Sequence, residues 1–386
     1  MEDFKSIILS VSIAAALFTA CSGKGSFTVS GLDPAKFDST VNEKPVKLYT
    51  LKNSKGMEVC ITNFGGRIVS LCVPGKNGKP VDVVLGYDNL KQYTDSVNSP
   101  SDFGASIGRY ANRINKGIIT IDGKKVQLPT NNYGHCLHGG PSGWQYQVYD
   151  GNQQNDSTLQ LTMNSKDGDN NFPGNVKAVV TYTVKENNTL DIRYEATTDK
   201  ETVINMTNHS YFNLTGDMTK PGMNMVLFIN ADNYTPSDAT FMTTGEIKQV
   251  KGTLMDFTKP HAISKTIGDS TFIQIKNAKG YDHNWCLNTY KDGKGDDAVV
   301  AASLYAPNTG IYLEMYTTEP GIQVYTGNFL EGKVKGKHGI SYPRRCSVCL
   351  ESQKYPDSPN KKNWPSPYLK PGEKYESHTA FKFSVK

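Results

Sequence analysis

The sequence lacks most of the features that mark nucleic-acid-binding, membrane-spanning or repeat proteins. Its 42 basic and 37 acidic residues leave a net charge of only +5, and neither sign forms a long run. Proteins that bind nucleic acid concentrate basic charge on one surface, so no nucleic-acid partner is expected. No repeat of roughly 20 to 50 residues is visible, which argues against a propeller or a solenoid.

Long helical periodicity is also missing after residue 20. The 35 Gly, 21 Tyr and 15 Phe favour strands and turns over helices. From Lys47 onward, short alternating runs are separated by turn residues at intervals of about ten residues. No linker-like break follows, so we expect one large all-β domain over residues 46–386, an antiparallel β-sandwich. Clear examples of the runs are 81–87, 118–124 (with a hairpin-like Asp-Gly), 178–184, 189–195 and 311–316.

The longest apolar run, residues 7–20, is too short for a stable membrane-spanning helix. It ends in Phe-Thr-Ala-Cys-Ser at 18–22, which resembles a bacterial lipobox. We therefore predict a signal peptide over residues 1–20 and lipidation of Cys21, with an ordinary secretory signal as the alternative. The expected location is the cell envelope, anchored by lipid to a bacterial membrane on its periplasmic or surface side. The alternative is a soluble secreted or periplasmic protein, and membrane contact is expected only through the anchor.

Residues 21–45 mix Gly, Ser, Asp, Lys and Pro and are predicted to form a flexible tether. With Cys21 lipidated, an even number of cysteines remains, which permits disulfides in an exported protein. Most of them lie in apolar strand-like runs, where buried free thiols are equally natural, so no pairing is predicted. These cysteines are Cys60, Cys72, Cys136, Cys286, Cys346 and Cys349.

Three motifs that suggest cofactors or metals lack the context that such sites need. Residues 293–298 match a dinucleotide-binding glycine pattern but lie in a polar stretch without strand–helix surroundings. Cys346 and Cys349 form a single C-x-x-C in a strand-like run, where residues three apart point to opposite faces. His135 and His138 likewise have no partner cluster at metal-binding spacing. We expect neither a metal nor a cofactor.

The most informative segment is 207–214, Thr-Asn-His-Ser-Tyr-Phe-Asn-Leu. Its polar side chains lie among bulky apolar ones, where they are costly unless each finds a partner. A polar ligand could supply the partners, and a satisfied core histidine is the alternative. An extended strand would place Thr207, His209, Tyr211 and Asn213 on one face.

Four further segments carry polar groups in apolar or glycine-rich surroundings, and each has a structural alternative. Residues 108–114 hold two arginines and an asparagine, which could instead form a surface turn. His138 precedes two glycines that would let a ligand approach the backbone, or it could be a structural turn residue. Asp282 lies between aromatic residues, or caps a turn. Glu351 interrupts an apolar strand, where burial would raise its pKa and suit a base, unless it forms a structural ion pair.

In this order, the segments resemble the aldose 1-epimerases, also called galactose mutarotases. The resemblance covers roughly residues 45–386 and includes 320–329, 355–360 and 369–373. It implies a β-sandwich of the galactose mutarotase type with an open polar cleft on one sheet. It also implies Glu351 as the catalytic base and His209 as the catalytic acid. The implied sugar-binding residues are Arg113, Asn112, His138, Asp282 and Gln323.

The implied reaction interconverts the α and β anomers of a free hexose, D-galactose or D-glucose, without a cofactor. A base takes the proton of the C1 hydroxyl while an acid protonates the ring oxygen, and the open aldehyde turns before it closes again. The expected partner is a small aldose, and a monomer is expected. Two rival functions stay open. One is a non-catalytic envelope sugar-binding protein on the same fold, and the other is a glycoside hydrolase with Glu351 and Asp282 as its carboxylate pair.

Overall fold

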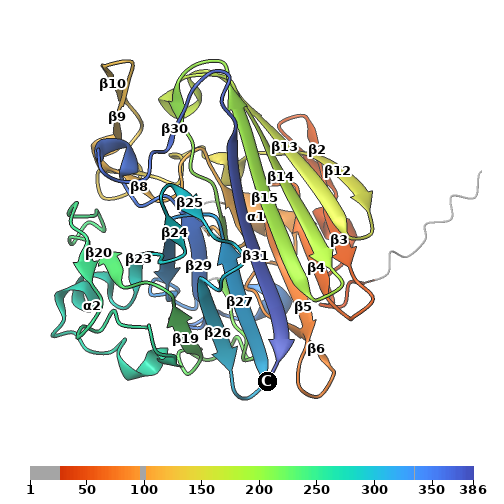
Figure 1. Cartoon of the computed structure of the whole chain (residues 1–386). Coiled ribbons are helices and arrows are strands. Elements are labelled where there is room, and N and C mark those ends of the chain that lie inside the picture. The colour runs from red at the N-terminus through yellow and green to blue at the C-terminus, as the bar shows by residue number, and fades with distance from the viewer. Residues whose placement is uncertain (1–26, 96–100, 334) are drawn as a thin grey trace, which may run out of the picture.

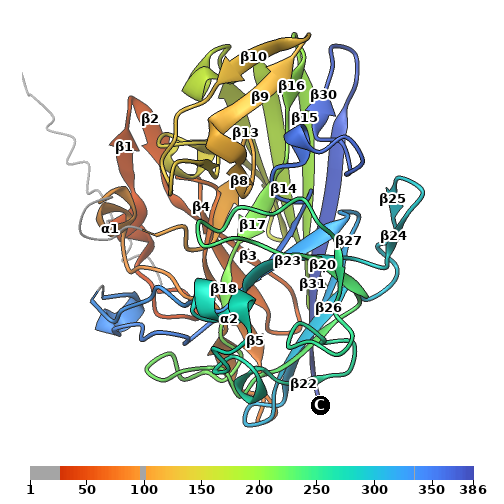
Figure 2. The same ribbon diagram turned by 90° about the vertical axis from the view of Figure 1, so that its left-hand side faces the viewer.

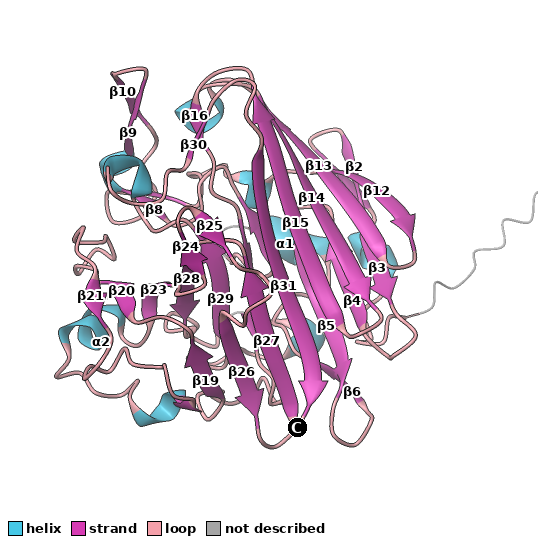
Figure 3. Ribbon diagram, viewed as in Figure 1, coloured by secondary structure: helices cyan, strands magenta, loops and turns pink. Residues whose placement is uncertain are grey.

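The computed structural model describes residues 27–95, 101–333 and 335–386. The predicted signal peptide and Cys21 lie outside the described residues. Within these ranges strands predominate, and the two α-helices are short: α1 (Leu90–Thr94) and α2 (Ile273–Ala278) (Figure 1, Figure 3). The all-β prediction is confirmed.

Three large antiparallel sheets build the described part of the chain. The nine-stranded sheet has the order β12 (Asp150–Asn155), β13 (Thr158–Ser165), β14 (Val176–Lys185), β15 (Thr189–Thr198), β31 (Tyr375–Val385), β27 (Ile311–Thr317), β26 (Ala302–Ala306), β19 (Val226–Ile229), β22 (His261–Ala262). The six-stranded sheet has the order β18 (Tyr211–Phe212), β29 (Val348–Gln353), β28 (Gly321–Tyr325), β23 (Asp282–Cys286), β20 (Asn233–Thr235), β21 (Lys248–Gln249). The four-stranded sheet has the order β3 (Leu48–Lys52), β4 (Glu58–Thr62), β5 (Arg67–Pro74), β6 (Pro80–Asp82).

Smaller strand pairs and 3-10 helices connect these sheets. The pairs are β1 (Ser39–Val41) with β2 (Lys44–Val46), β7 (Ala105–Ile107) with β17 (Thr207–His209), β8 (Arg113–Ile114) with β11 (Cys136–Leu137), β9 (Ile118–Ile121) with β10 (Lys124–Gln127), β16 (Thr202–Val203) with β30 (Tyr368–Leu369), and β24 (Tyr290–Lys291) with β25 (Lys294–Gly295). The 3-10 helices are η1 (Pro34–Phe37), η2 (Asn115–Gly117), η3 (Trp144–Tyr146), η4 (Asp169–Asn171), η5 (Ile263–Lys265), η6 (Lys337–Gly339) and η7 (Ser358–Asn360).

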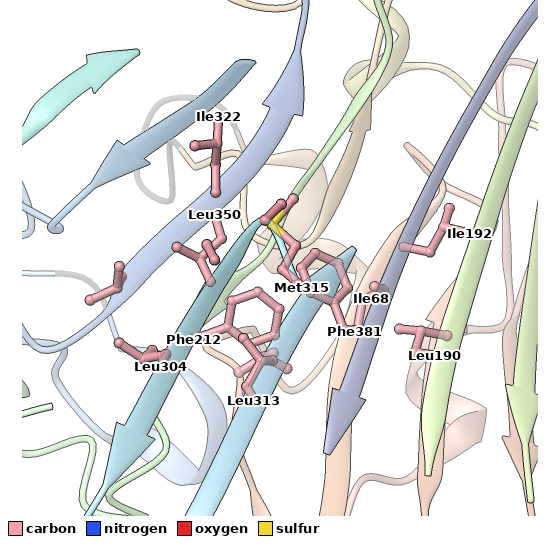
Figure 4. Close-up of a cluster of buried hydrophobic side chains, with 14 of the residues drawn as sticks. Ile68, Leu190, Ile192, Phe212, Leu304, Leu313, Met315, Ile322, Leu350 and Phe381 are labelled. Carbon is pink, nitrogen blue, oxygen red and sulfur yellow. The ribbon is translucent and has the colours of Figure 1, made fainter. Parts of the chain in front are cut away.

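The inner face of the nine-stranded sheet packs against the other two large sheets. Along β14, every second residue is buried, as expected for a strand with one face on a core. One buried cluster joins Ile68 of β5, Leu190 of β15, Phe212 of β18 and Leu350 of β29 (Figure 4). Side chains from two facing layers therefore fill one core, which makes the fold a sandwich.

Four of the five predicted strand runs are confirmed as strands, and one is shortened. The Asp122-Gly123 pair turns the β9–β10 hairpin with φ of 47° and 74°, as a tight two-residue turn requires. This hairpin projects at the top of the molecule (Figure 2). The predicted strand 81–87 is wrong in its second half, where pairing is reduced to a single bridge at Val84. There the backbone of Val83 bonds to two different segments: its N–H donates to the Leu71 carbonyl, and its carbonyl accepts the N–H of Asn213.

The flexible tether predicted for residues 21–45 is wrong over its described part. This stretch contains η1 and the β1–β2 hairpin, and it packs on the domain. Leu32 and Phe37 are buried in an apolar cluster, and the Phe37 ring lies 6.4 Å from that of Tyr93. Burial of these two apolar side chains helps to hold the stretch on the domain, although its composition resembles that of a linker.

All six cysteines that lie in the described residues are buried and free. Over the same residues, the helices are too short or too polar to cross a membrane.

Candidate active site

A cleft of about 430 Å³ opens on the six-stranded sheet and gathers every side chain predicted to bind sugar or act in catalysis. Their chain positions are far apart, so the fold brings them together. The residues are Asn112, Arg113, His138, His209, Asp282, Gln323 and Glu351. A larger surface hollow of about 610 Å³, beside Asp232 and His261, contains none of them.

Strand alternation builds the floor of the cleft from β23, β28 and β29. Gln323 lies directly opposite Glu351 in the ladder, and its Nε2 donates to Asp282 Oδ1 at 2.7 Å. Their neighbours in sequence, Ile322 and Leu350, belong to the buried core. A period of two therefore separates a polar cleft face from an apolar core face on the same strands.

His209 reaches the cleft from the end of β17. The predicted extended segment 207–214 is interrupted at Ser210, because β17 pairs with β7 whereas β18 pairs with β29. His209 Nε2 lies 3.5 Å from Glu351 Oε1, and both residues are almost fully buried, at 5% and 2% exposure. The His209 ring stacks on Tyr211, with centroids 5.1 Å apart and planes 22° apart. The catalytic pair proposed from the sequence is thus in reach for proton exchange.

One polar atom on each member of this pair has no hydrogen-bond partner among the described residues. These atoms are His209 Nδ1 and Glu351 Oε2, and both are buried. Folded proteins rarely leave such atoms unpaired, because each lost hydrogen bond is costly. A polar ligand in the cleft would supply the missing partners.

Glu351 has the acid–base property that a catalytic base requires. Burial raises the pKa of its carboxyl, the charges of Asp282 and Asp102 raise it further, and His209 and Arg113 oppose the rise; the resulting pKa is about 7. A carboxyl with this pKa can take up and release a proton near neutral pH.

His138 is held as a neutral hydrogen-bond donor. Burial lowers its pKa well below the usual value, and the neighbouring His209 and Arg113 lower it further. Its Nδ1 accepts a hydrogen bond from the backbone N–H of Asn112 at 3.1 Å, so the ring proton is on Nε2. His138 can therefore donate this proton in a hydrogen bond to a sugar hydroxyl.

Arg113 is fixed by neighbours before any ligand binds. Its Nε and Nη2 both donate to Asn132 Oδ1, at 3.1 and 2.9 Å, and its guanidinium lies 5.0 Å from the centroid of the Phe241 ring. Burial lowers the pKa of Arg113, while the charges of Asp282 and Glu351 oppose this. Asn112 supports the turn before it, since its side chain accepts the Arg113 N–H at 2.8 Å.

Asp282 carries the second carboxyl of the floor. Burial raises its pKa, and Arg113, Gln323 and His209 act in the opposite direction. Its hydrogen bond to Gln323 fixes one oxygen. The carboxyl group is thus positioned as an acceptor for sugar hydroxyls.

Two polar residues of the motifs lie outside the cleft and have structural roles. Arg109 is buried and donates to Ser165 Oγ at 2.8 Å and to the Lys166 carbonyl at 2.7 Å. Asn213 donates to the Cys346 carbonyl at 2.6 Å. Of the segment around His209, it is Tyr211 that faces the cleft.

Asp102 lines the cleft and was missed by the sequence reasoning. Its carboxylate lies close to His138 and His209, with one ligand atom of each within 4.8 Å of the others. Its sequence context, an acid before Phe-Gly, gives no signal of a site. Pairing of β7 with β17 creates the proximity, because Gly104 N–H donates to the His209 carbonyl at 3.0 Å.

Among the residues that the structure describes, two groups of side chains could in principle hold a cation. One is Asp102, His138 and His209, and the other is His209, Cys349 and Glu351. Both groups include His209, and the second also includes Glu351. A cation bound to either group would therefore occupy His209 or Glu351, the two side chains that must exchange protons in acid–base chemistry.

The fold and the cleft define a class of protein: an antiparallel β-sandwich whose polar cleft contains a buried carboxylate–imidazole pair. Residues 47–382 match the family model of the aldose 1-epimerases. The chain belongs to the aldose 1-epimerase family.

Relatives and solved structures agree with this assignment. The chain is 39% identical to the galactose mutarotase of Bos taurus over 86% of its length and 92% of the relative. It is 38% identical to the aldose 1-epimerase of Escherichia coli (strain K12) over 88% of its length and 96% of the relative. A crystal structure of an aldose epimerase homologue from C. elegans superposes with a TM-score of 0.79 at 29% identity, covering 88% of this chain and 99% of the other. These similarities confirm the predicted family and its fold.

Proposed function

We propose that this enzyme interconverts the α and β anomers of a free hexose such as D-galactose or D-glucose. The observation that carries the proposal is the Glu351–His209 pair, 3.5 Å apart, with one unpaired buried atom on each side chain. The similar proteins from Bos taurus and Escherichia coli are named galactose mutarotase and aldose 1-epimerase. A non-catalytic sugar-binding protein is less favoured, because binding alone has no need of a buried acid–base pair.

The reaction requires two coordinated proton transfers. Glu351 takes the proton of the C1 hydroxyl, and protonated His209 gives a proton to the ring oxygen as the bond from C1 to that oxygen breaks. The C1 aldehyde then turns about the C1–C2 bond. Glu351 returns its proton to the aldehyde oxygen while His209 takes back the hydroxyl proton, and the ring closes on the other face. Such transfer contributes about 10²–10⁴-fold to the rate, and orientation of the sugar adds more.

The remaining cleft residues hold the sugar. Arg113 and the Nε2–H of His138 donate to hydroxyl oxygens, and Asp282 accepts from hydroxyl groups. Gln323 orients Asp282. Asn112 donates its backbone N–H to the His138 ring and accepts the Arg113 N–H with its side-chain oxygen, so it helps to position both residues. Because all these groups come from one chain, we propose a monomer as the active unit.

Polarimetry of freshly dissolved α-D-galactose and α-D-glucose tests the proposal through its pH dependence. We expect enzymatic mutarotation to rise with pH as Glu351 loses its proton, centred near its pKa of about 7. Because the reaction needs a deprotonated base and a protonated acid at the same time, the profile is expected to be bell-shaped. A profile of kcat/KM that stays flat from acid to mildly basic pH contradicts the mechanism.

Asp102→Asn provides the matched variant for this profile. The Asp102 charge raises the pKa of Glu351, so its removal should move the acid limb to lower pH. Asp150→Asn is the control, because Asp150 is an exposed carboxylate paired with Lys44. An unmoved acid limb in Asp102→Asn would show that this charge does not act on the base.

We also propose that the mature protein is a lipoprotein attached at Cys21 to a bacterial envelope membrane. The lipobox-like sequence that ends the apolar run 7–20 supports this. The wild-type protein is expected in the membrane fraction of expressing bacteria, and Cys21→Ser in the soluble fraction. Equal fractionation of the two proteins would favour an ordinary secretory signal.

A further inference from the structure

Asp102 adds a carboxylate to the cleft that the proton transfers do not use. Among the described residues that line the cleft, the carboxyl groups belong to Asp102, Asp282 and Glu351, and the guanidinium belongs to Arg113. Asp102 is partly exposed. The Tyr146 hydroxyl lies 3.5 Å from Asp102 Oδ1, which is long for a hydrogen bond. The carboxylate of Asp102 can therefore accept a shorter hydrogen bond from a ligand in the cleft.

The backbone on both sides of Asp102 is fixed. Arg67 is fully buried, and its Nη1 donates to the carbonyls of Ser101 and Phe103, each at 3.2 Å. The Asp102 carbonyl itself accepts the N–H of Ala105 at 3.0 Å. The carboxylate thus extends from a backbone that is positioned before a ligand binds, as a selective binding group requires.

His209 has Asp102 as a second carboxylate neighbour beside Glu351. Glu351 Oε1 lies 3.5 Å from His209 Nε2. A carboxylate oxygen of Asp102 and one ring nitrogen each of His138 and His209 lie within 4.8 Å of one another. Over the described residues, no group of this kind contains both Asp102 and Glu351. The two carboxylates therefore occupy separate positions beside the proposed acid.

The proton transfers decide which part of the sugar lies near Asp102. His209 protonates the ring oxygen and Glu351 takes the C1 hydroxyl proton, so C1 lies toward Glu351. The other ring neighbour of this oxygen is C5, which carries C6 and its hydroxyl. A ring oxygen about 2.8 Å from His209 and a C6 hydroxyl about 2.7 Å from Asp102 fit between groups at most 4.8 Å apart.

We propose that Asp102 is the residue that selects the substituent at C6 of the sugar, by accepting a hydrogen bond from the C6 hydroxyl. The inference rests on the proposed anomer interconversion and narrows its substrate class to aldoses with a neutral hydroxyl at C6. A 6-deoxy sugar leaves the carboxylate without this donor, and a sugar acid with a carboxylate at C6 meets a like charge.

Polarimetry of three sugars tests this selection. D-galactose, D-fucose (6-deoxy-D-galactose) and D-galacturonate share the same ring and differ at C6. We expect wild-type kcat/KM for D-galactose to exceed that for D-fucose roughly 10-fold or more, as for a lost hydrogen bond to a charged group. D-galacturonate should be at least as poor a substrate as D-fucose, because its charge is repelled.

Two variants separate the acceptor from the charge of Asp102. Asp102→Ala removes the acceptor and should bring the ratio of kcat/KM for D-galactose to that for D-fucose close to one. Asp102→Asn keeps an acceptor oxygen, so it should retain part of this preference and raise kcat/KM for D-galacturonate relative to D-galactose roughly 10-fold. The effect of the Asp102 charge on the pKa of Glu351 changes all three sugars alike, so the ratios isolate the contact at C6.

Asp282→Asn is the matched control, because it changes another carboxylate of the same cleft. It should lower kcat/KM for D-galactose and D-fucose by the same factor. Equal wild-type values for D-galactose and D-fucose overturn the assignment of Asp102. A preference that persists in Asp102→Ala, or that is lost in Asp282→Asn instead, also overturns it. If Asp102→Ala does not fold, an unchanged D-galacturonate to D-galactose ratio in Asp102→Asn has the same meaning.

Calorimetric binding to Glu351→Gln measures the contact at C6 without catalysis. In this background we expect D-galactose to bind more tightly than D-fucose, and the additional Asp102→Ala change to remove the difference. Equal affinities for the two sugars overturn the assignment. If wild type fails to mutarotate D-galactose while the binding difference is present, the proposed reaction fails and the role of Asp102 in binding stands.

Discussion

Glu351→Gln is expected to lower kcat/KM for hexose mutarotation by roughly 10²–10⁴-fold, the usual contribution of a general base. Glutamine has the same shape and still forms hydrogen bonds, but it cannot accept the C1 hydroxyl proton. The variant should be at least as stable as wild type, because the buried carboxyl has an unpaired Oε2 and an unfavourable environment that raises its pKa to about 7. Polarimetry and thermal unfolding measure the two effects.

The matched control is Glu319→Gln, which removes another buried carboxylate. Glu319 lies outside the cleft and pairs with Lys354 at 2.8 Å. This variant should keep its activity and lose stability, the reverse of Glu351→Gln. His209→Asn should cost about as much activity as Glu351→Gln, and the double variant little more, because the two proton transfers act together in one ring-opening step. The assignment of Glu351 and His209 as an acid–base pair would be contradicted if the activity losses of the two single variants multiplied in the double variant. It would also be contradicted if Glu351→Gln kept its activity.

Asp82→Asn is expected to lower the free energy of unfolding by about 3–5 kcal/mol, the usual cost of leaving a buried charge without its partner. Lys337 is 1% exposed, and its ammonium contacts Asp82 and the carbonyls of Val69 and Val84. Asparagine keeps the size of the side chain and an acceptor oxygen but removes the compensating charge. Urea unfolding should show a lower midpoint with an unchanged slope.

Lys337→Met tests whether losing the lysine of this pair costs less stability than losing the aspartate. Asp82 is partly exposed and also accepts the backbone N–H of Leu71 at 3.1 Å, so its carboxylate should tolerate the loss better than the ammonium does. The exposed pair Lys44–Asp150 is the control, and Asp150→Asn should cost less than about 1 kcal/mol. Similar losses for Asp82→Asn and Asp150→Asn would mean that the buried pair does not contribute to stability.

Much of the fold could be predicted because strand periodicity is local. The alternation in β14, β15 and β27 places apolar residues on one face whatever the partner strands are. The prediction failed where tertiary contacts overrode local composition. The described part of residues 21–45 has the composition of a linker, yet Leu32 and Phe37 are buried against the domain.

The site was also predictable in part. A glutamate inside the apolar strand β29 and a histidine beside β18 are unusual enough to indicate chemistry, and both line the cleft. Asp102 carries no such signal. Its relevance comes from the pairing of β7 with β17, which brings it close to His209.

The sequence by itself determined the β-sandwich class, the aldose 1-epimerase resemblance and the residue types of the acid–base pair. Periodicity and unusual polar residues are properties of short segments, so they can be recognised without coordinates. The tertiary structure alone decided the 3.5 Å approach of His209 to Glu351, the proton position on His138, and the placement of Arg109 outside the cleft. It also decided the raised pKa of Glu351 and the stacking of the His209 ring on Tyr211. Burial, Coulombic effects and ring contacts depend on distances between segments far apart in the chain, and those distances exist only after folding.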